Sequence, residues 1–510
     1  MTIGHYRRYG SPRNCIKLPR VMRRILPSHT RESFHPERNP LRHLELPAPS
    51  LLERPRRNGL TESKPPHSSP FRLLPLSLVV LHQNSEKNKA TTVVSQALLL
   101  RLSSNVVSQK GNRLLHPSIA INPHFYPFRT RVLVPVANST EPMEAVITID
   151  VLRRAGADVT VASVEKDLRI GCSWGVKLVA DALISECANT TFDLISLPGG
   201  MPGASTLRDC EVLKSLVQKH AADGRLYGAI CASPAVALGE WGLLKGLKAT
   251  CYPSFMDKLA ANATAVESRV QVDGLVVTSR GPGTAMEYSL VLVEQLFGKE
   301  KADEVAGAMV TRPKHGVEYT MTELNSVDWK CDNSPHILVP IASGTEEMEA
   351  VMIIDVLRRA KANVTVASIE DKFEIEASRK VKLVADMLLE AAEKLRYDLI
   401  VLPGGLGGAQ AFSSSEKLVN LLKKQKESNM PCGAICASPA LGKKATAYPA
   451  MCNKLSDPSE IENRVLVDGN LITSRGPGTS MEFAFAIVEK FFGRAKALDL
   501  TKTMVFTQYN

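Results

Sequence analysis

The sequence predicts two copies of one α/β domain, each with a parallel sheet covered by helices on both faces, after an N-terminal extension. Two observations predict this: a set of motifs that occurs twice in the same order, and short apolar runs that alternate with helical periods. Arg-Val-Leu-Val-Pro-Val at 131–136 opens the first copy, and the second opens at Ile337. With 510 residues, the chain is long enough for each copy to bury its own core.

The extension, residues 1–128, has a composition unlike the rest of the chain. It holds 20 Lys and Arg against 6 Glu and no Asp, which accounts for the formal net charge of +11. The remainder is close to neutral, so the charge predicts no nucleic-acid partner. The apolar stretch Leu73–Leu81 is interrupted by Pro75 and Ser77 and is far shorter than the roughly 20 residues of a membrane span. We therefore expect no membrane partner.

Strands and helices alternate in the first copy. Val132–Val136 is a continuous apolar run, as expected of a strand buried on both faces, and Met143–Ala155 spaces its apolar residues by three and four. Asp158–Val164, Phe192–Leu197 and Leu226–Ile230 are three further predicted strands. The predicted domain boundaries are 1–128 for a disordered extension, 129–312 for the first domain, 313–335 for a linker and 336–510 for the second domain.

The second copy has a gap after Cys436. Cys231 and Cys436 are 205 residues apart, whereas Tyr252 and Tyr448, further along each copy, are only 196 apart, so nine residues are missing between Cys436 and Tyr448. At 3.6 residues per turn, this removes about two and a half turns of the helix expected behind the cysteine. We therefore expect the second site to be impaired, with a splice variant or an error in the gene prediction as the cause of the gap.

Cysteine and histidine patterns predict no metal site. The ten cysteines have irregular spacings without a Cys-x-x-Cys pair, which is typical of a reduced intracellular chain. Only His220, His315 and His336 follow residue 128. We expect neither a structural metal nor a cofactor.

Cys231 has the sequence context of a nucleophile. It ends an apolar strand, and Ala232-Ser233-Pro234 follows as the opening of a predicted helix, which is the strand–turn–helix pattern of a nucleophile elbow. Backbone N–H groups and the helix dipole would favour the thiolate, so we expect a lowered thiol pKa. A buried, inert cysteine is the alternative interpretation.

Two further elements end at the same edge of the predicted sheet. Gly199 and Gly200 follow the strand beside that of Cys231, and the N–H groups of Gly200 and Ala232 would form an oxyanion hole. Glu144 lies in the first turn of the helix after the first strand. Each feature alone has an ordinary structural explanation, a turn or a dipole partner. Because parallel strands bring their carboxyl ends together, the combination predicts a catalytic site.

These motifs resemble the DJ-1/PfpI family, in its DJ-1 branch. The resemblance rests on Glu-Pro-Met-Glu at 141–144, Leu-Pro-Gly-Gly at 197–200, Ala-Ile-Cys-Ala-Ser-Pro at 229–234 and Ser-Arg-Gly-Pro-Gly-Thr at 279–284, with their second copies. It covers about 131–312 and 336–508 and implies a flavodoxin-like, class I glutamine amidotransferase-like sandwich in each copy.

The tandem arrangement is similar to plant members in which two fused domains imitate the family homodimer. The resemblance therefore implies an intramolecular pseudo-dimer, with a homo-oligomer as a further state. In a plant chain, an Arg-, Ser- and Pro-rich extension that is poor in acids is typical of a transit peptide and predicts chloroplast localisation. A disordered extension of a cytoplasmic or nuclear protein, and upstream sequence included in error, remain alternatives.

The activity that the resemblance implies is a cofactor-free glyoxalase that converts the 2-oxoaldehydes methylglyoxal and glyoxal to lactate and glycolate without glutathione. A cysteine redox sensor with little turnover is the alternative, and a protein deglycase is a third candidate. Peptide or amide hydrolysis is weaker, because Ala232 stands where the hydrolase relatives have a histidine. By resemblance, the nucleophiles are Cys231 and Cys436, the acid/base groups Glu144 and Glu349, and the oxyanion and substrate-binding positions Gly199, Gly200, Ala232, Gly404, Gly405 and Ala437.

Two substitutions depart from the family pattern around the site. Tyr252 and Tyr448 stand where many members have a histidine near the cysteine, and they are the remaining candidate binding residues. A tyrosine hydroxyl could still donate a hydrogen bond there. Trp174 replaces an arginine that Arg379 retains in the second copy. We therefore expect reduced activity rather than none.

Overall fold

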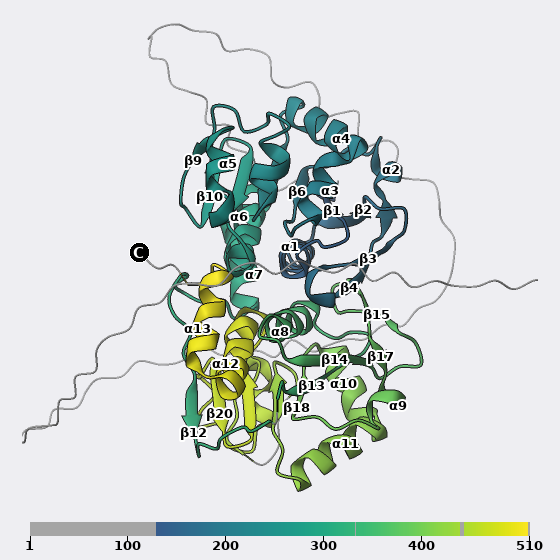
Figure 1. Cartoon of the computed structure of the whole chain (residues 1–510), viewed down its shortest axis with the longest axis vertical. Helices are drawn as coiled ribbons and strands as arrows, with labels where there is room; N and C mark the ends of the chain where they lie inside the picture. The colour runs from purple at the N-terminus through teal and green to yellow at the C-terminus, as the bar shows by residue number, and fades with distance from the viewer. Residues whose placement is uncertain (1–128, 332, 439–442, 508–510) are drawn as a thin grey trace, which may run out of the picture. The chain divides into compact units, whose positions relative to one another are not determined.

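The computed structural model describes residues 129–331, 333–438 and 443–507, so the predictions for residues 1–128 lie outside its described part. Figure 1 colours the first repeat blue to teal and the second repeat green to yellow. The first repeat consists of β1 (Arg131–Val136), α1 (Pro142–Arg154), β2 (Asp158–Ser163), β3 (Arg169–Gly171), β4 (Lys177–Val179), β5 (Ala182–Leu183), α2 (Ile184–Cys187), β6 (Leu194–Leu197), α3 (Gly203–Asp209), α4 (Glu211–Ala222), β7 (Leu226–Ile230), β8 (Lys248–Ala249), α5 (Met256–Ala260), β9 (Thr264–Ala265), β10 (Val270–Asp273), β11 (Val276–Ser279), α6 (Ala285–Phe297) and α7 (Lys299–Ala308).

The second repeat follows the same order after a short connecting strand. Its elements are β12 (Thr322–Leu324), β13 (His336–Ile341), α8 (Glu347–Arg359), β14 (Asn363–Ser368), β15 (Glu374–Glu376), β16 (Lys382–Val384), β17 (Met387–Leu388), α9 (Leu389–Ala392), β18 (Leu399–Leu402), α10 (Leu406–Ser414), α11 (Glu416–Glu427), β19 (Cys432–Ile435), β20 (Val465–Asp468), β21 (Leu471–Ser474), α12 (Ser480–Phe492) and α13 (Arg494–Thr503).

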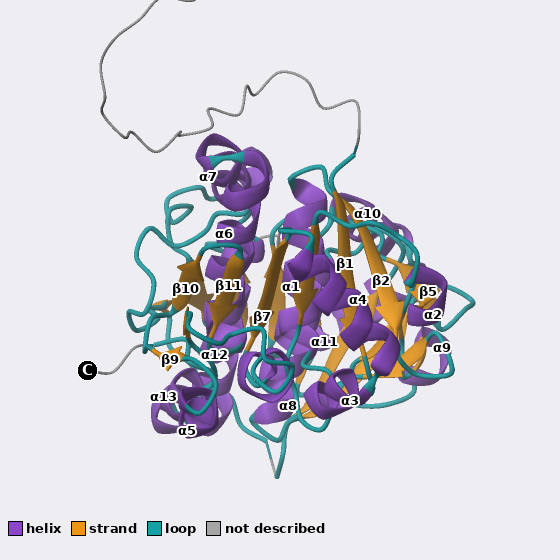
Figure 2. Cartoon of the chain, turned by 90° about the horizontal axis from the view of Figure 1, so that it is seen from above, coloured by secondary structure: helices purple, strands orange, loops and turns teal. Residues whose placement is uncertain are grey.

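Each repeat has one main sheet with helices on both faces, as Figure 2 shows. The first sheet has the order β10-β11-β7-β6-β1-β2-β5, and the second has β12-β20-β21-β19-β18-β13-β14-β17. The predicted α/β class is confirmed, with a correction to the pairing: β10 and β20 run antiparallel to β11 and β21. These pairs are tight hairpins whose turns contain Gly274 and Gly469, both at positive φ. Within the predicted linker, β12 pairs with β20 and so extends the second sheet.

Helix α1 illustrates how local sequence produces an element that serves the site. The side chain of Glu141 caps the helix by accepting a hydrogen bond from the Glu144 backbone N–H at 2.7 Å. Pro142 stands in the first turn, and Arg153 and Arg154 lie in the last turn, where positive charges interact favourably with the helix dipole. The cap fixes Glu144 one turn into the helix, at the carboxyl end of β1.

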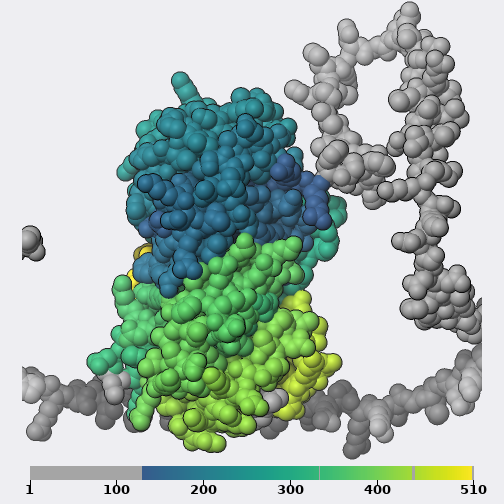
Figure 3. Space-filling view, turned by 90° about the vertical axis from the view of Figure 1, so that its right-hand side faces the viewer, coloured from purple at the N-terminus to yellow at the C-terminus, as the bar shows by residue number. Residues whose placement is uncertain are grey.

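The two repeats share one hydrophobic core and are in contact along a broad face (Figure 3). Helices α1 and α8 pack against each other between the two sheets, and the buried cluster includes Ile147 of α1 and Ile353 of α8. A small sheet also crosses the boundary, because β16 of the second repeat pairs antiparallel with β4 of the first. The repeats therefore form a single packed unit.

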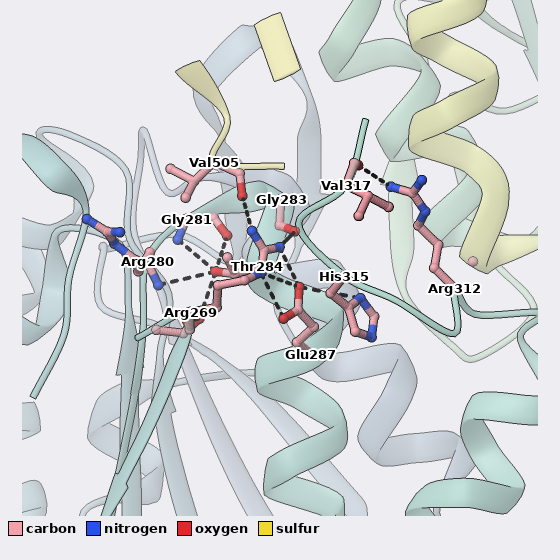
Figure 4. A network of polar contacts seen from close by, with 12 residues as sticks. Arg269, Arg280, Gly281, Gly283, Thr284, Glu287, Arg312, His315, Val317 and Val505 are labelled. Atoms are coloured by element: carbon pink, nitrogen blue, oxygen red, sulfur yellow. Dashed lines mark hydrogen bonds and ion pairs between the residues drawn. The ribbon is translucent and has the colours of Figure 1, made fainter. Parts of the chain in front are cut away.

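The end of each repeat docks on the other repeat. Arg269 donates to the carbonyl of Val505 at 3.0 Å, beyond α13 of the second repeat, and its Nε lies 2.9 Å from Glu287 (Figure 4). Arg464 makes the matching bond to the carbonyl of Val310, beyond α7 of the first repeat, at 3.0 Å. These reciprocal contacts bring α7 to the second cysteine and α13 to the first.

The segment behind Cys231 differs from the predicted helix. Pro234–Leu238 is a single π-helical turn, and Gly239 and Gly242 follow it in turns rather than in a continuing α-helix. Proline and glycines disfavour a longer helix here. This segment nevertheless covers one face of the sheet, since Leu238, Trp241 and Leu244 in and after the turn are buried.

The corresponding face of the second repeat carries a cavity among the described residues. Residues 439–442 lie outside the described residues, and a cavity of about 430 Å³ lies between β19 and α11, lined by Leu402, Val419, Leu422 and Cys432 among others. Repeat 1 fills this place with the segment that carries Trp241. The nine missing residues therefore fall within the stretch that forms the π-helical turn and the following turns in repeat 1.

No helix in the described part of the chain has the length and apolar composition needed to cross a bilayer.

Candidate active site

Cys231 lies in a sharp turn immediately after β7. Its φ of 65° is in the left-handed region, which non-glycine residues rarely adopt, and two hydrogen bonds hold its backbone there. The N–H donates to the carbonyl of Ser279 at 3.0 Å, and the carbonyl accepts from Tyr252 N–H at 2.8 Å. A strained residue of this kind at a strand end is the geometry of a nucleophile elbow.

Glu144 is fully buried beside the thiol. Its Oε2 accepts a hydrogen bond from the Gly199 N–H at 2.8 Å, and the carboxyl is also in hydrogen-bonding contact with the Cys231 thiol. The other oxygen, Oε1, is buried and has no hydrogen-bond partner among the described residues. A buried oxygen without a partner is costly in a folded protein and is therefore often functional.

Gly199 makes this approach possible. A Cβ added at Gly199 would lie 2.6 Å from the Cys231 Cβ and 2.8 Å from Glu144 Oε2, both inside normal contact distances. Gly200 has a φ of 92°, which favours glycine, and its N–H hydrogen-bonds the Cys231 sulfur. Ala232 lines the pocket next to the cysteine. The structure thus brings the predicted oxyanion residues to the nucleophile.

The expected lowering of the Cys231 pKa is wrong. Burial raises the pKa of the thiol well above its usual range, and the neighbouring Glu144 charge raises it further, while the hydrogen bond from the Gly200 N–H lowers it. The expected helix dipole is weak because Pro234–Leu238 is one short turn. Burial also raises the pKa of Glu144 to about 7, despite opposing hydrogen bonds from Gly199 and Cys231. The pair therefore holds a proton near neutrality, and the carboxyl can exchange it with the sulfur.

The second repeat has the same local geometry. Cys436 has a φ of 63°, and Glu349 Oε2 accepts a hydrogen bond from Gly404 N–H at 2.6 Å. Burial raises the pKa of Glu349 to about 7 and that of Cys436 well above its usual range. Gly405 hydrogen-bonds the Cys436 sulfur, and the N–H of Ala437 lies near Gly404. The gap after Cys436 has not removed the elbow itself.

A pocket of about 380 Å³ opens above the first cysteine and is built from both repeats. Gly200, Cys231 and Ala232 contribute the reactive edge from the first repeat. Arg359 and Thr503 reach it from the second repeat. The remaining lining residues are Glu141, Ser173, Trp174, Met201, Tyr252, Phe255 and Pro282. The first site is therefore incomplete without the second repeat.

Tyr252 and Tyr448 line their elbows but use their hydroxyls to join the repeats. The Tyr252 hydroxyl donates to the carbonyl of Thr503 at 2.9 Å, and that of Tyr448 donates to the carbonyl of Ala308 at 3.1 Å. From the sequence, each hydroxyl was expected to be able to donate to the reacting group. The structure assigns these protons to the carbonyl ends of α13 and α7 instead.

Arginines from the opposite repeat were not found from the sequence. Arg359 pairs with Glu141 at 2.8 Å in the first site, and Arg154 pairs with Glu346 at 2.6 Å in the second. Each arginine also pairs with an aspartate one turn earlier on its own helix, a spacing that is visible in the sequence. Their ion pairs with glutamates of the opposite repeat cannot be read from the sequence, because these pairs depend on how α1 and α8 pack.

One group of buried carboxylates, Asp150, Glu346 and Glu347, has oxygens close enough together to hold a cation. Arg154 pairs with Asp150 and Glu346, while Glu347 accepts hydrogen bonds from Ser378 and from the Arg379 N–H at 2.8 and 2.9 Å. These partners already satisfy the carboxylates, so the group is explained as part of the repeat boundary.

Comparison with known proteins places this geometry in context. The sequence profile of the DJ-1/PfpI family matches residues 130–295 and 335–490. Protein DJ-1 homolog B of Arabidopsis thaliana is 62% identical over 430 residues, covering 82% of this chain and 98% of the relative. Protein DJ-1 homolog A of the same plant is 59% identical over 385 residues, covering 74% and 98%.

A more distant relative has an activity in its name. The glutathione-independent glyoxalase DJR-1.2 of Caenorhabditis elegans is 36% identical over 175 residues, covering 34% of this chain and 91% of the relative. The similarity thus corresponds to about one repeat of the present chain.

Proposed function

This chain belongs to the DJ-1/PfpI family, and from that premise we propose that it is a glutathione-independent glyoxalase that converts small 2-oxoaldehydes such as methylglyoxal to 2-hydroxy acids. The observation that carries the proposal is the Cys231–Glu144 pair. A buried carboxyl, one of whose oxygens has no hydrogen-bond partner in the described part of the chain, contacts a thiol in an elbow at a pocket. The relative from Caenorhabditis elegans that is named as such a glyoxalase supports the same activity.

A proton-balanced mechanism follows from the geometry. As the sulfur attacks the aldehyde carbon, Glu144 takes the thiol proton, and the new oxyanion is stabilised by the N–H groups of Gly200 and Ala232. Glu144 then protonates this oxygen. The carboxylate so formed removes the hydrogen of the former aldehyde carbon as a proton and returns it to the neighbouring carbonyl carbon. The hydroxyl proton on the first carbon passes to the oxygen of the second carbon, which leaves a 2-hydroxy thioester. Water hydrolyses the thioester, releases the acid and restores the thiol.

Substituting Glu144 by glutamine tests the proposal. Glutamine has nearly the same shape but cannot take a proton, so lactate production from methylglyoxal by the full chain, without glutathione or metal, is expected to fall at least about 100-fold. The matched control is Glu349→Gln in the second repeat, for which we expect less than about a twofold loss since most turnover uses the first site. Lactate production by Glu144→Gln equal to that of the unmodified chain would rule out this mechanism.

The pH dependence gives a second test. Burial raises the pKa of Glu144 to about 7, so below neutrality the carboxyl is protonated and cannot accept the thiol proton. We expect kcat/KM to rise as pH increases from about 6 to about 8, with a midpoint near the carboxyl pKa. Initial rates of aldehyde consumption over this range measure it. A kcat/KM that falls through neutrality would contradict the role of Glu144 as the base.

The same thiol supports redox sensing as a second candidate function. Cys231 is half-buried at an open pocket, whereas Cys172, Cys187 and Cys251 of the same repeat are buried. Peroxide oxidation to a sulfinate would place two oxygens beside the Glu144 carboxyl and the Gly200 N–H. Oxidation of Cys231 in Glu144→Gln, followed by mass spectrometry, separates the two functions, because oxidation does not require Glu144 to move a proton between carbons.

Members of the DJ-1 family are often dimers. In this chain the second repeat contributes Arg359 and Thr503 to the first pocket, so we propose that the repeats act together as an internal dimer. The predicted small-molecule substrate would then bind between repeats of one chain.

A further inference from the structure

Three large apolar or aromatic side chains line the first pocket in addition to its reactive residues. Trp174, Met201 and Phe255 all line the pocket, and Trp174 and Met201 are 36% and 46% exposed. A methyl substituent, as in methylglyoxal, needs only a small part of a pocket of about 380 Å³. Exposed apolar side chains gathered in a concave site are typical of a ligand contact rather than of chance exposure.

Trp174 is held in place by its backbone. Its φ of 57° and ψ of 22° are left-handed, which is unfavourable for a bulky residue. Neighbouring bonds maintain this conformation: Ser173 N–H donates to the carbonyl of Thr140 at 3.0 Å, and Arg358 donates to the Trp174 carbonyl at 3.0 Å. The strain indicates that the position of the indole matters.

Two cations fix the indole ring itself. The Arg359 guanidinium lies 4.6 Å from the ring centroid, and the Lys361 ammonium lies 5.6 Å from it. Arg359 is in turn anchored by Asp355 and by Glu141, so its charge is already paired. The pocket therefore presents an ordered aromatic ring beside a neutralised cation, an arrangement suited to an apolar group rather than an anion.

The second repeat provides an internal comparison. Arg379, Leu406 and Met451 occupy the positions that correspond to Trp174, Met201 and Phe255, so both aromatic residues are absent there. Arg379 also differs from Trp174 in its backbone, because it does not have a positive φ. The aromatic wall is thus specific to the first site.

We propose that the first site is selective for 2-oxoaldehydes with an aromatic or bulky apolar substituent on the ketone carbon, which packs against Trp174. The inference rests on the proposed glyoxalase function and specifies its substrate class. Cys231 engages the aldehyde carbon as in the mechanism above, and the substituent extends along Trp174, Met201 and Phe255. Phenylglyoxal, which forms mandelate, is the probe for such a substrate, and methylglyoxal is the small reference.

The first experiment compares kcat/KM for the two aldehydes in the full chain. We expect phenylglyoxal to be preferred, and the ratio of its kcat/KM to that of methylglyoxal to fall about tenfold in Trp174→Arg, which introduces the residue of the second repeat. Trp174→Phe is expected to retain most of the preference, because it keeps an aromatic face. An unchanged ratio in a folded Trp174→Arg variant would overturn the inference.

The second experiment measures binding without turnover. Trp241 and Trp329 are only 8% and 5% exposed, so the exposed Trp174 is the tryptophan whose emission a pocket ligand is expected to change. Mandelate is expected to quench tryptophan fluorescence at concentrations at which lactate does not. The quenching should disappear in Trp174→Phe and persist in the control Trp241→Phe.

These two readouts separate failure of the inference from failure of the proposed function. If neither aldehyde is converted, the glyoxalase proposal fails, while selective mandelate quenching through Trp174 would still support an aromatic subsite. Equal responses to mandelate and lactate, or quenching that survives Trp174→Phe, would overturn the subsite. If Trp174→Arg fails to fold, this binding test still decides whether the first pocket has an aromatic subsite at Trp174.

Discussion

Replacing Cys231 by serine is expected to reduce lactate production from methylglyoxal by at least about 100-fold, down to what the second site supplies, because a hydroxyl is a far weaker nucleophile in the same place. In the same assay, Cys436→Ser is expected to retain more than about half of the activity. Both cysteines have the elbow backbone, with φ values of 65° and 63°. The expected difference in activity between the two sites must therefore arise from the packing behind each elbow.

The support differs on the face of the sheet behind each elbow. In the first repeat, buried Leu238, Trp241 and Leu244 pack there, whereas a cavity of about 430 Å³ occupies that face of the second repeat. Loss of packing partners permits displacement of the elbow, and a misplacement of about 1 Å can cost about 100-fold in rate. If Cys231→Ser instead retained about half the activity, the two sites would be equally competent and the gap would have no functional effect.

Gly199→Ala is expected to have the second-largest effect, at least about a 100-fold loss of kcat/KM together with about 1–3 kcal/mol of destabilisation from overpacking. The new Cβ would lie 2.6 Å from the Cys231 Cβ and 2.8 Å from Glu144 Oε2. It must therefore push the nucleophile and the acid/base group apart. Initial rates and thermal unfolding measured on the same preparations provide the two readouts.

Two glycines provide controls for this variant. Gly404→Ala would meet the same clash in the second repeat, where the Cβ lies 2.6 Å from the Cys436 Cβ, so it should lower stability while leaving most activity. In Gly307→Ala, the added Cβ would have no atom of the described residues within 4 Å, so neither stability nor activity should fall. Normal turnover by Gly199→Ala would show that close contact between Glu144 and Cys231 is unnecessary.

Much of the fold follows from local sequence. The predicted strands Val132–Val136, Asp158–Val164 and Leu226–Ile230 agree with β1, β2 and β7 within one residue at each end, because short, mainly apolar stretches form buried strands. The helix predicted at Met143–Ala155 is shifted by one residue from α1. The elbow at Cys231 and its contact with Glu144 also follow, since parallel strands align their carboxyl ends.

The tandem repetition was equally accessible from sequence, because motif order is preserved at a constant spacing up to Cys436. Spacing alone also revealed the gap, although it suggested an α-helix where the first repeat has a π-helical turn and further turns. Proline and glycine within that segment were the local signal for the difference.

By itself, the sequence determined which elements form and which side chains meet at the carboxyl edge of each sheet, because strand period, capping and turn residues are local properties. Only the tertiary structure decided that Arg359 and Thr503 complete the first pocket and that the Tyr252 hydroxyl binds the end of α13. It also decided the raised thiol pKa, because burial and neighbouring charge depend on which surfaces pack together. Contacts between residues more than 200 positions apart have no local signature in the chain.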